Sequence, residues 1–299
     1  MTEPMTESLP PLREGSVRLK DGRRLAFAES GDPSGMPVVF LHGNPGSRYM
    51  RHPDDSLSYR LGVRLITPDR PGYGHSDYQP ERTLLDCPSD IEQLANMLGL
   101  GRFALLGVSA GGPYTAACAF RLGERVTRAA IVSGAAPFDR PKATQGVNRD
   151  YRNAYALAAW PEWLLHPIMA LHDRSVRSNP KRAMMALLAQ CSADDRATLA
   201  NPALAAQMKG WRLEATRQGV SGMRREAHIL VSPWGFRLEE IRSEVHLWYW
   251  EADTIVPQQM GRYLASRIPH AVPHFLPRGG HFSLFTHWKD ILTPLVRPE

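Results

Sequence analysis

Short apolar runs alternate with helix-like stretches over the first half of the chain. Each run has the length of a buried strand, and together they cover Pro37–His42, Val63–Pro68, Phe103–Val108 and Val126–Ser133. Ser89-Asp-Ile-Glu92 has the pattern of a capping box, which predicts the start of a helix that ends near Gly99 or Gly101. A second helix is predicted over Ala110–Leu122. Strands that alternate with helices in this way predict a mostly parallel sheet with helices on both faces.

The N-terminal region has a different pattern. Two extended segments, Ser16–Lys20 and Arg23–Glu29, flank Asp21-Gly22, a pair that is typical of a hairpin turn. Residues 1–15 before them are polar and show no periodic pattern. We therefore expect a flexible tail over residues 1–15, followed by a hairpin.

From residue 138 to residue 237 the strand pattern disappears. Helical runs replace it, at Tyr151–Ala159, Pro161–Leu171, Pro180–Cys191 and Pro202–Arg217. The earlier pattern then resumes with a strand, a helix, a strand and a helix, at Glu244–Glu251, Gln258–Arg267, Ala271–Leu276 and after Phe282. We predict an α/β core over residues 16–137 and 238–299, with residues 138–237 inserted after the sixth strand as a helical cap.

Composition places the chain among compact globular proteins. It has 299 residues, of which 43% are hydrophobic and 22% charged, and a net charge of +6. The hydrophobic content is too high, and the net charge too small, for an intrinsically disordered chain. The 36 lysines and arginines are spread along the sequence rather than gathered with aromatic residues, so we expect no nucleic-acid partner.

The cysteines and the longest uncharged stretch bear on the compartment. Cys87, Cys118 and Cys191 are too few and too far apart for a disulfide framework or a metal site, and we expect no cofactor. The first residues do not show the basic and then apolar pattern of a secretory signal. Phe103–Phe120 is 18 residues long without a charge, but its central glycines and Pro113 favour a strand, a turn and a helix over a membrane span. We expect a cytoplasmic protein without stable membrane association.

The strongest chemical signal is Gly107-Val108-Ser109-Ala110-Gly111, which has the form G-x-S-x-G. It lies between a predicted strand and a predicted helix, as the nucleophile turn of a serine hydrolase does. Small residues two positions on either side are needed because the turn strains the backbone at the serine. The N-terminal amides of the following helix, at the positive end of its dipole, point toward Ser109. Ser109 is the predicted nucleophile.

A serine hydroxyl is a weak nucleophile and needs a base within hydrogen-bonding reach. Of the 11 histidines, His270 and His274 fall on or beside the predicted last strand, and His287 lies in the last helix. His281 follows Arg278-Gly279-Gly280, in a loop just after that strand. A parallel sheet presents its functional residues at this edge, so His281 is the predicted base.

The histidine in turn needs a carboxylate that holds its tautomer and stabilises the imidazolium. Asp253 follows the predicted strand over Glu244–Glu251 and lies on a loop at the same edge of the sheet. Glu251, nearer the strand, and Asp139, after an earlier strand, are the alternatives. The chain order Ser109, Asp253, His281 is the order typical of this architecture.

Acyl transfer also requires hydrogen-bond donors for the developing oxyanion. One predicted donor is the backbone amide of Ala110, directly after the nucleophile. The other comes from the loop His42-Gly43-Asn44-Pro45-Gly46, where Pro45 has no amide hydrogen and either Asn44 or Gly43 must supply it. We assign the second donor to Asn44.

Two further features have structural interpretations. Asp69-Arg-Pro-Gly-Tyr-Gly-His-Ser76 is a turn, because it lacks the residues of a phosphate-binding or dinucleotide-binding loop. The insert is rich in Trp and Met, which either line an apolar pocket over Ser109 or form the insert's own core: Trp160, Trp163, Trp211, Trp234, Met169, Met184, Met185, Met208 and Met223.

Four blocks, in this order, resemble the α/β-hydrolase superfamily. They are HGNPGS at 42–47, DRPGYGHS at 69–76, GVSAGG at 107–112, and EADTIVP with GGHF at 251–257 and 279–282. The resemblance covers about residues 16–134 and 243–298 and implies a mostly parallel central sheet flanked by helices, with a helical cap after the sixth strand.

Individual members of that superfamily differ from this chain. Haloalkane dehalogenases and capped epoxide hydrolases use an aspartate where this chain has Ser109. The HGNPG stretch is similar to the HGGPG of proline iminopeptidases, which usually carry a tryptophan where this chain has Ala110.

The resulting hypothesis is a cofactor-independent serine hydrolase that cleaves a small, largely apolar carboxylic ester through an acyl-enzyme. A proline iminopeptidase-like aminopeptidase is one alternative, and it needs cap carboxylates for the substrate ammonium, from among Glu162, Asp173, Asp194, Asp195 and Glu214. A C–C bond hydrolase with the same triad is another. A non-catalytic small-molecule receptor would not require all three triad residues.

Overall fold

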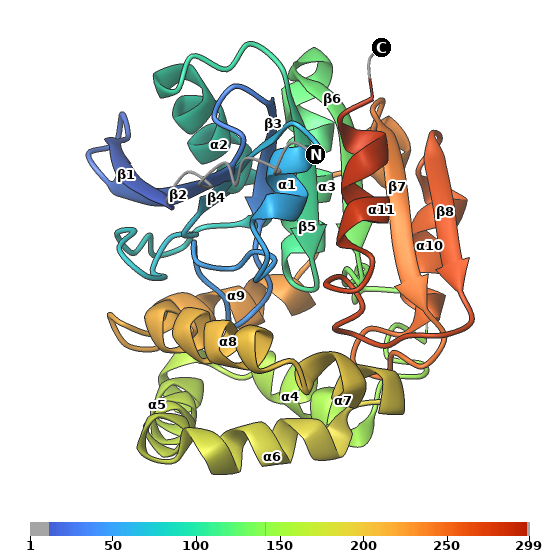
Figure 1. Cartoon of the computed structure of the whole chain (residues 1–299). Coiled ribbons are helices and arrows are strands. Elements are labelled where there is room, and N and C mark those ends of the chain that lie inside the picture. Colours follow the sequence, from blue (N-terminus) through green and yellow to red (C-terminus); the bar gives the residue numbers. More distant parts are fainter. Residues whose placement is uncertain (1–11, 141, 298–299) are drawn as a thin grey trace, which may run out of the picture.

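One β-sheet forms the centre of the structure. The structure is a computed structural model, which describes residues 12–140 and 142–297. Over these residues the sheet has eight strands in the order β1-β2-β4-β3-β5-β6-β7-β8 (Figure 1). The strands are β1 (Arg13–Arg18), β2 (Arg24–Gly31), β3 (Met36–Leu41), β4 (Val63–Pro68), β5 (Phe103–Val108), β6 (Val126–Val132), β7 (Glu244–Trp250) and β8 (Ala271–Leu276). β2 pairs antiparallel with both β1 and β4, and the other pairs are parallel.

Hydrophobic side chains alternate between the two faces of this sheet. In β3, Val39 and Leu41 belong to one buried cluster, whereas Val38 and Phe40 belong to the other. The first cluster includes residues of α2, α3 and α10, and the second includes residues of α1 and α11. These helices are α1 (Ser56–Arg60), α2 (Cys87–Met97), α3 (Gly111–Leu122), α10 (Gln258–Arg267) and α11 (Trp288–Leu295). The sheet is therefore covered on both faces, as the sequence pattern predicts.

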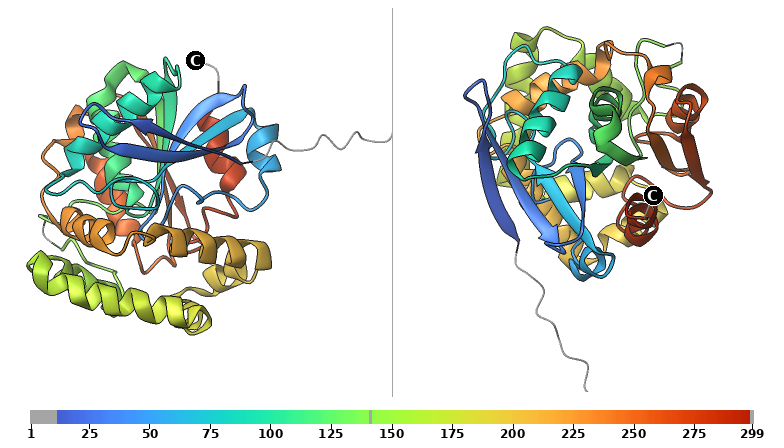
Figure 2. Two further views of the ribbon diagram at one scale, coloured as in Figure 1. Left: turned by 90° about the vertical axis from the view of Figure 1, so that its left-hand side faces the viewer. Right: turned by 90° about the horizontal axis from the view of Figure 1, so that it is seen from above.

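The helices between β6 and β7 gather at one end of the sheet, beyond the carboxyl ends of the parallel strands (Figures 1 and 2). They are α4 (Arg149–Ala158), α5 (Glu162–Ser178), α6 (Pro180–Gln190), α7 (Ala193–Leu199), α8 (Pro202–Ala215) and α9 (Ser221–Val231). We refer to them together as the cap. The sequence pattern misses α7, which is short and polar, and α9, which opens with Ser-Gly and several charges.

Several core elements have the predicted bounds, among them β5, α10 and β8. The prediction of a capping box at Ser89 is wrong. The box is formed by Thr83 and Asp86 around the 3-10 helix η1 (Leu84–Asp86), which leads directly into α2. Since Pro88 fits the first turn of a helix, α2 begins before Ser89.

The predicted boundary of the N-terminal tail also changes. β1 begins at Arg13 because Arg13 pairs with Glu29 of β2, so the ladder extends three residues into the predicted tail. Residues 1–11 of that tail lie outside the described residues. There are two further short 3-10 helices: η2 (Gly123–Arg125) lies between α3 and β6, and η3 (Leu238–Glu240) lies between α9 of the cap and β7.

The uncharged stretch from Phe103 to Phe120 forms β5, a sharp turn and most of α3. Among the helices that the structure describes, none is both long and apolar enough to cross a membrane.

The sheet and α3 are packed closely at the turn after β5, and a substitution in this turn tests that packing. A Cβ atom on Gly107 would lie 2.0 Å from Oγ1 of Thr115 and 2.6 Å from the carbonyl oxygen of Gly111. We expect Gly107→Ala to lower the free energy of unfolding by about 1–3 kcal/mol, measured by urea denaturation. Gly101→Ala is the control, because a Cβ at that position would meet no other atom within 4 Å, and it should change stability by less than about 0.5 kcal/mol. Equal stability of the two variants would contradict this account of the turn.

Candidate active site

Ser109 occupies the sharp turn between β5 and α3. Its φ of 55° lies in the left-handed region, which a serine adopts at a cost in free energy. Its backbone amide donates to the carbonyl of Val132 at 2.9 Å, and its own carbonyl accepts from Gly112 at 3.0 Å. A Cβ on Gly111 would lie 2.0 Å from the carbonyl oxygen of Leu41. The small residues around Ser109 are therefore required by the packing, as the sequence predicts.

His281 and Asp253 are joined by a hydrogen bond. Nδ1 of His281 lies 2.9 Å from Oδ2 of Asp253, and both side chains are buried. Asp253 lies on the loop after β7 and His281 on the loop after β8, so both belong to the carboxyl edge of the sheet. This bond fixes Nδ1 as the donor and leaves Nε2 as the ring nitrogen that can accept a proton.

The carboxylate of Asp253 has partners on both oxygens. Oδ1 accepts from the amides of Ile255 and Val256, each at 2.9 Å. Oδ2 accepts from His281 and also from the hydroxyl of Ser133, at 2.7 Å. Ser133 is not among the site residues predicted from the sequence, although its position directly after β6 places it at the same edge of the sheet.

The two alternative carboxylates do not contact His281. Glu251 and Asp139 are both exposed, and no hydrogen bond of the described residues joins either to the histidine. Asp139 lies instead beside a surface hollow with Trp234. Of the three candidate carboxylates, the structure pairs Asp253 with His281.

The environment of His281 changes its pKa. Burial disfavours the charged imidazolium and lowers the pKa, whereas the charge of Asp253 and its hydrogen bond raise it. The pKa-raising contributions are larger, so the pKa of His281 lies above the usual value for histidine.

Ser109 is connected to this pair through the backbone. The amide of Ser109 bonds to Val132, and the next residue, Ser133, donates its hydroxyl to Asp253. The hydrogen bonds of the described residues do not include one between the hydroxyl of Ser109 and His281. The three predicted triad residues thus share one edge of the sheet and one network, in which the direct contact is between Asp253 and His281.

The loop after β3 lies against Ser109. A Cβ on Gly43 would be 3.4 Å from the Cβ atom of Ser109. None of the hydrogen bonds among the described residues uses the amide of Ala110 or of Asn44. The side-chain oxygen of Asn44 accepts from the hydroxyl of Tyr73 at 3.2 Å. The loop that carries Gly43 and Asn44 thus lies beside the turn of Ser109, and the assignment of the oxyanion donors to Asn44 and Ala110 stays a prediction.

This loop is held by a buried arginine that the sequence pattern identifies only as part of a turn. The guanidinium of Arg70 donates to the carbonyls of His42 and Gly43. Glu226 of α9 accepts from Arg70 at 2.7 and 2.6 Å, and both side chains are buried. The interpretation of Asp69–Ser76 as a turn is correct. Through Arg70, this turn also connects the loop after β3 to the cap.

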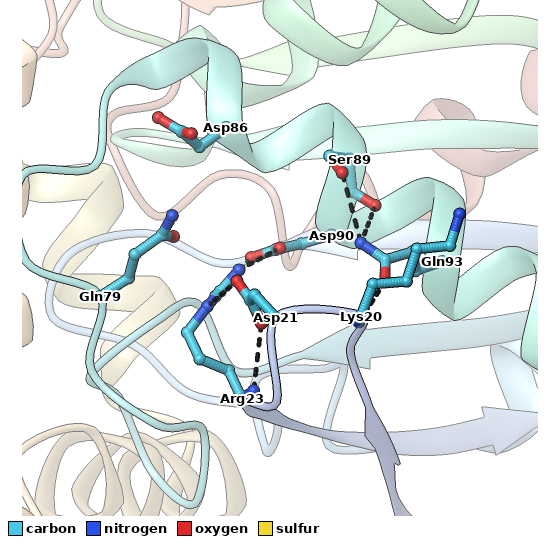
Figure 3. Close-up of a pocket in the computed structure, with 8 residues that line it drawn as sticks. All are labelled: Lys20, Asp21, Arg23, Gln79, Asp86, Ser89, Asp90 and Gln93. Atoms are coloured by element: carbon cyan, nitrogen blue, oxygen red, sulfur yellow. Dashed lines mark hydrogen bonds and ion pairs between the residues drawn. The ribbon is translucent and has the colours of Figure 1, made fainter.

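Two surface hollows lie away from Ser109. One, of about 220 Å³, is lined by residues near the β1–β2 turn and α2: Lys20, Asp21, Arg23, Gln79, Asp86, Ser89, Asp90 and Gln93 (Figure 3). Within it, Arg23 pairs with Asp90 at 2.6 Å and with Asp21 at 2.7 Å, so its cation is already matched. Over residues 12–140 and 142–297, no group of three His, Cys, Asp or Glu side chains is placed to hold a metal ion.

Several curated proteins that are similar to this chain in sequence are named proline iminopeptidase. A proline iminopeptidase from Neisseria gonorrhoeae is 32% identical over 126 residues, which cover 41% of this chain and 40% of that protein. A proline iminopeptidase from Xanthomonas citri is 35% identical over 109 residues, or 34% of each chain. The matched region thus spans about two fifths or less of these relatives.

The solved structures resemble the whole fold at low sequence identity. An esterase from Exiguobacterium antarcticum has a TM-score of 0.69 at 19% identity, over 95% of this chain and 99% of the other. A bromoperoxidase from Bacillus anthracis has a TM-score of 0.70 at 20% identity, over 96% and 100% of the two chains. At such identities the likeness concerns the fold alone.

The sequence model of the alpha/beta hydrolase fold family matches residues 36–287 of this chain. This match includes the serine turn, the cap and the loops that carry Asp253 and His281. The sheet order, the helices on both faces and the cap after the sixth strand agree with it. The chain belongs to the alpha/beta hydrolase fold family.

Proposed function

We propose that this protein is a serine hydrolase that cleaves a small, largely apolar carboxylic ester through an acyl-enzyme. Ser109 is the nucleophile, His281 the general base and Asp253 the carboxylate that orients it. The amides of Ala110 and Asn44 form the oxyanion hole. The observation that carries the proposal is the buried His281–Asp253 hydrogen bond at the sheet edge where Ser109 occupies its strained turn.

The proposed reaction has two halves. Nε2 of His281 takes the proton of Ser109 as the serine oxygen attacks the ester carbonyl, and the two amides stabilise the oxyanion. The imidazolium, stabilised by Asp253, then gives its proton to the leaving alcohol. In the second half, His281 activates a water that attacks the acyl-enzyme, and Ser109 is regenerated.

The proposed substrate is a small molecule, and we propose no cofactor and no nucleic acid for the reaction. We also propose a cytoplasmic location and keep the domain bounds predicted from the sequence, with residues 138–237 as the cap over the site. The cap residues Met208 and Trp211 are buried in the cluster that also contains Phe285. These apolar residues of α8 pack the cap against the core, with Trp211 stacked on Phe285.

An aminopeptidase is the second candidate, because the matched relatives bear that name. A substrate ammonium would require a cap carboxylate that is not already paired. All five candidates are engaged: Glu162 with Arg224 and Arg225, Asp173 with Arg177 and Thr216, Asp194 with the amide of Gly279, Asp195 with the amides of His281 and Phe282, and Glu214 with Arg48. Three of these acids, Glu162, Asp173 and Glu214, are ion-paired with arginines, and this pairing favours an ester over a free amino terminus.

Substrate choice and Ser109 dependence test the proposal together. We expect hydrolysis of p-nitrophenyl butyrate to exceed that of Pro-p-nitroanilide in kcat/KM. Ser109→Ala should lower ester turnover on the order of 10⁶-fold. Ser178→Ala, at an exposed serine of α5, is the matched control and should keep full activity. A fluorophosphonate probe should label the wild type and not Ser109→Ala.

Each other result selects a different function. Preference for the anilide would assign the site to an aminopeptidase. Labelling of Ser109 without turnover of either substrate would indicate C–C bond hydrolysis, and no labelling would indicate a receptor. Full ester activity in Ser109→Ala would refute the nucleophile.

The pH dependence follows from His281. The neutral ring is the active form and its pKa is raised, so kcat/KM should decrease as pH falls through a value above about 6.5. In Asp253→Asn the raising charge is lost while burial remains. We therefore expect the acid limb to move to lower pH and kcat to fall about 10⁴-fold.

Glu251→Gln is the control for this profile, because it removes an exposed carboxylate two residues away. It should leave both kcat and the acid limb unchanged. An unshifted limb in Asp253→Asn would mean that Asp253 does not set the charge state of the base.

A further inference from the structure

The loop that carries His281 is held from the cap by two carboxylates of α7. Asp195 accepts from the amide of His281 at 3.1 Å through Oδ2 and from the amide of Phe282 at 2.7 Å through Oδ1. Asp194 accepts from the amide of Gly279 at 2.6 Å. The cap thus binds three backbone donors of one short loop.

Asp195 is buried and held in place at this contact. Its side chain is 2% exposed, and its own amide is held by the hydroxyl of Ser192 at 3.0 Å. A Cβ on Gly280 would lie 2.1 Å from Oδ2 of Asp195, so the loop approaches the carboxylate as closely as a glycine allows. Asp194, by contrast, is exposed.

We propose that Asp195 is a positioning residue for His281, through which the cap fixes the catalytic base. The proposal rests on the proposed role of His281. Hydrogen bonds from backbone amides to a charged carboxylate are stronger than those between neutral groups. Here they fix the position of the backbone at His281 and Phe282. Asp253 then fixes the orientation of the imidazole ring, while Asp195 fixes the position of the His281 backbone. The cap is in this view part of the catalytic apparatus as well as a cover.

Asp195 also acts on His281 through its charge. The groups that face the imidazole are Asp253, which has the larger effect, and Asp195; both raise its pKa against the effect of burial. Tyr151, Tyr155, Tyr249 and Cys191 lie on the Asp253 side, and burial raises the pKa of each above its usual value. These four groups stay neutral where His281 titrates, so the carboxylates govern its charge.

Asp195→Asn keeps the shape of the side chain and removes its charge. We expect kcat for p-nitrophenyl butyrate to fall about tenfold, KM to stay within about twofold, and the acid limb of kcat/KM to move to lower pH. Asp150→Asn, at an exposed acid in the first turn of α4, is the matched control and should change none of these. Rates are normalised to the chains that react with a fluorophosphonate, so unfolded molecules are not counted.

The outcomes separate this proposal from the proposed function. A wild type without Ser109-dependent hydrolysis would refute the function itself. A wild type that is active, beside an Asp195→Asn variant with unchanged kcat and an unchanged acid limb, would refute only the role of Asp195. A lower kcat with an unmoved limb would reduce Asp195 to a structural contact and also overturn the proposal.

A separate observation concerns the outside of the cap. Seven large hydrophobic residues are highly exposed among the described residues, and five of them lie between residues 160 and 185. We refer to these five as the outer cap face: Trp160, Trp163, Ile168, Leu171 and Met185. Trp163 and Met185 are 74% and 62% exposed, so neither has the core or pocket role considered from the sequence, and Leu171 is 70% exposed.

Two members of the face share one side of α5. Trp163 and Leu171 are eight residues apart, with the exposed Pro167 midway between them at the i, i+4 spacing. Lys181 and Met185 have the same spacing in α6. Both helices lie at the end of the cap farthest from the sheet (Figures 1 and 2).

The exposed charges of residues 160–190 have one sign. They are all cations: Arg174, Arg177, Lys181 and Arg182. The two acids of this stretch, Glu162 and Asp173, are only partly exposed or buried, and both are paired with arginines. Face-to-face pairing with a second copy would bring cations together, whereas an anionic surface would attract them.

We infer that the outer cap face binds the surface of an anionic lipid bilayer. Tryptophans favour the membrane–water interface, and basic residues beside them favour anionic headgroups. The contact is peripheral and reversible, unlike the stable membrane association that the sequence argues against. It would bring the cap, and the substrate site beneath it, to apolar esters that partition into the membrane.

Sedimentation of the full chain with lipid vesicles tests this inference. We expect binding to phosphatidylcholine vesicles that contain about 30% phosphatidylglycerol, and about tenfold weaker binding without the anionic lipid. Trp163→Ser combined with Leu171→Ser should weaken binding about tenfold, and Lys181→Glu combined with Arg182→Glu should do the same. Met97→Ser and Arg242→Glu, at exposed positions outside the face, are the controls. Hydrolysis of soluble p-nitrophenyl butyrate should be unchanged in all four variants.

Equal sedimentation with and without anionic lipid, or no sedimentation, would overturn the inference. Analytical ultracentrifugation tests the alternative, in which the outer cap face binds a second copy of the chain. A dimer that Trp163→Ser with Leu171→Ser dissociates would assign the face to a second copy of the chain.

Discussion

A negative charge buried at the edge of the sheet is the constraint on which the site depends. A carboxylate in the protein interior is costly unless every lone pair finds a donor. Asp253 meets that condition with two backbone amides, a serine hydroxyl and an imidazole. Those donors come from the loop after β7, from the residue after β6 and from the loop after β8. Satisfying one charge therefore fixes the relative positions of three loops.

The cap is attached to the core by the same kind of interaction. Glu226 of α9 binds Arg70, Glu214 of α8 binds Arg48, and Asp195 of α7 binds the amides beside His281. Each of these acids reaches a loop next to the proposed site rather than a remote surface. The carboxylates that would suit an ammonium group in the substrate are thus used to hold the architecture. The chain resembles proline iminopeptidases in sequence over a limited region, and in this chain these three acids of the cap bind residues of the core.

The core elements could be predicted from sequence because burial and local signals agree there. β5, α10 and β8 combine apolar pattern with clear boundaries, and Gly107 and Gly111 mark the turn around Ser109. The roles of Ser133 and Asp195 could not be predicted, since both depend on contacts between residues far apart in the chain. Their residue types are common, and no local pattern distinguishes a serine that supports a carboxylate from a surface serine. The same limit hid α7, whose importance lies in its partners and not in its own periodicity.

The position of the cap within the chain has a consequence for biosynthesis. The proposed nucleophile precedes the cap, whereas Asp253 and His281 follow it, so a ribosome completes the serine turn long before the base exists. A nascent chain that has folded its first strands carries an unactivated alcohol and no hydrolytic chemistry. Reactivity would arise only when the last loops close onto a cap that is already made. The order of synthesis thus separates the folding of the serine turn from the assembly of the proposed base.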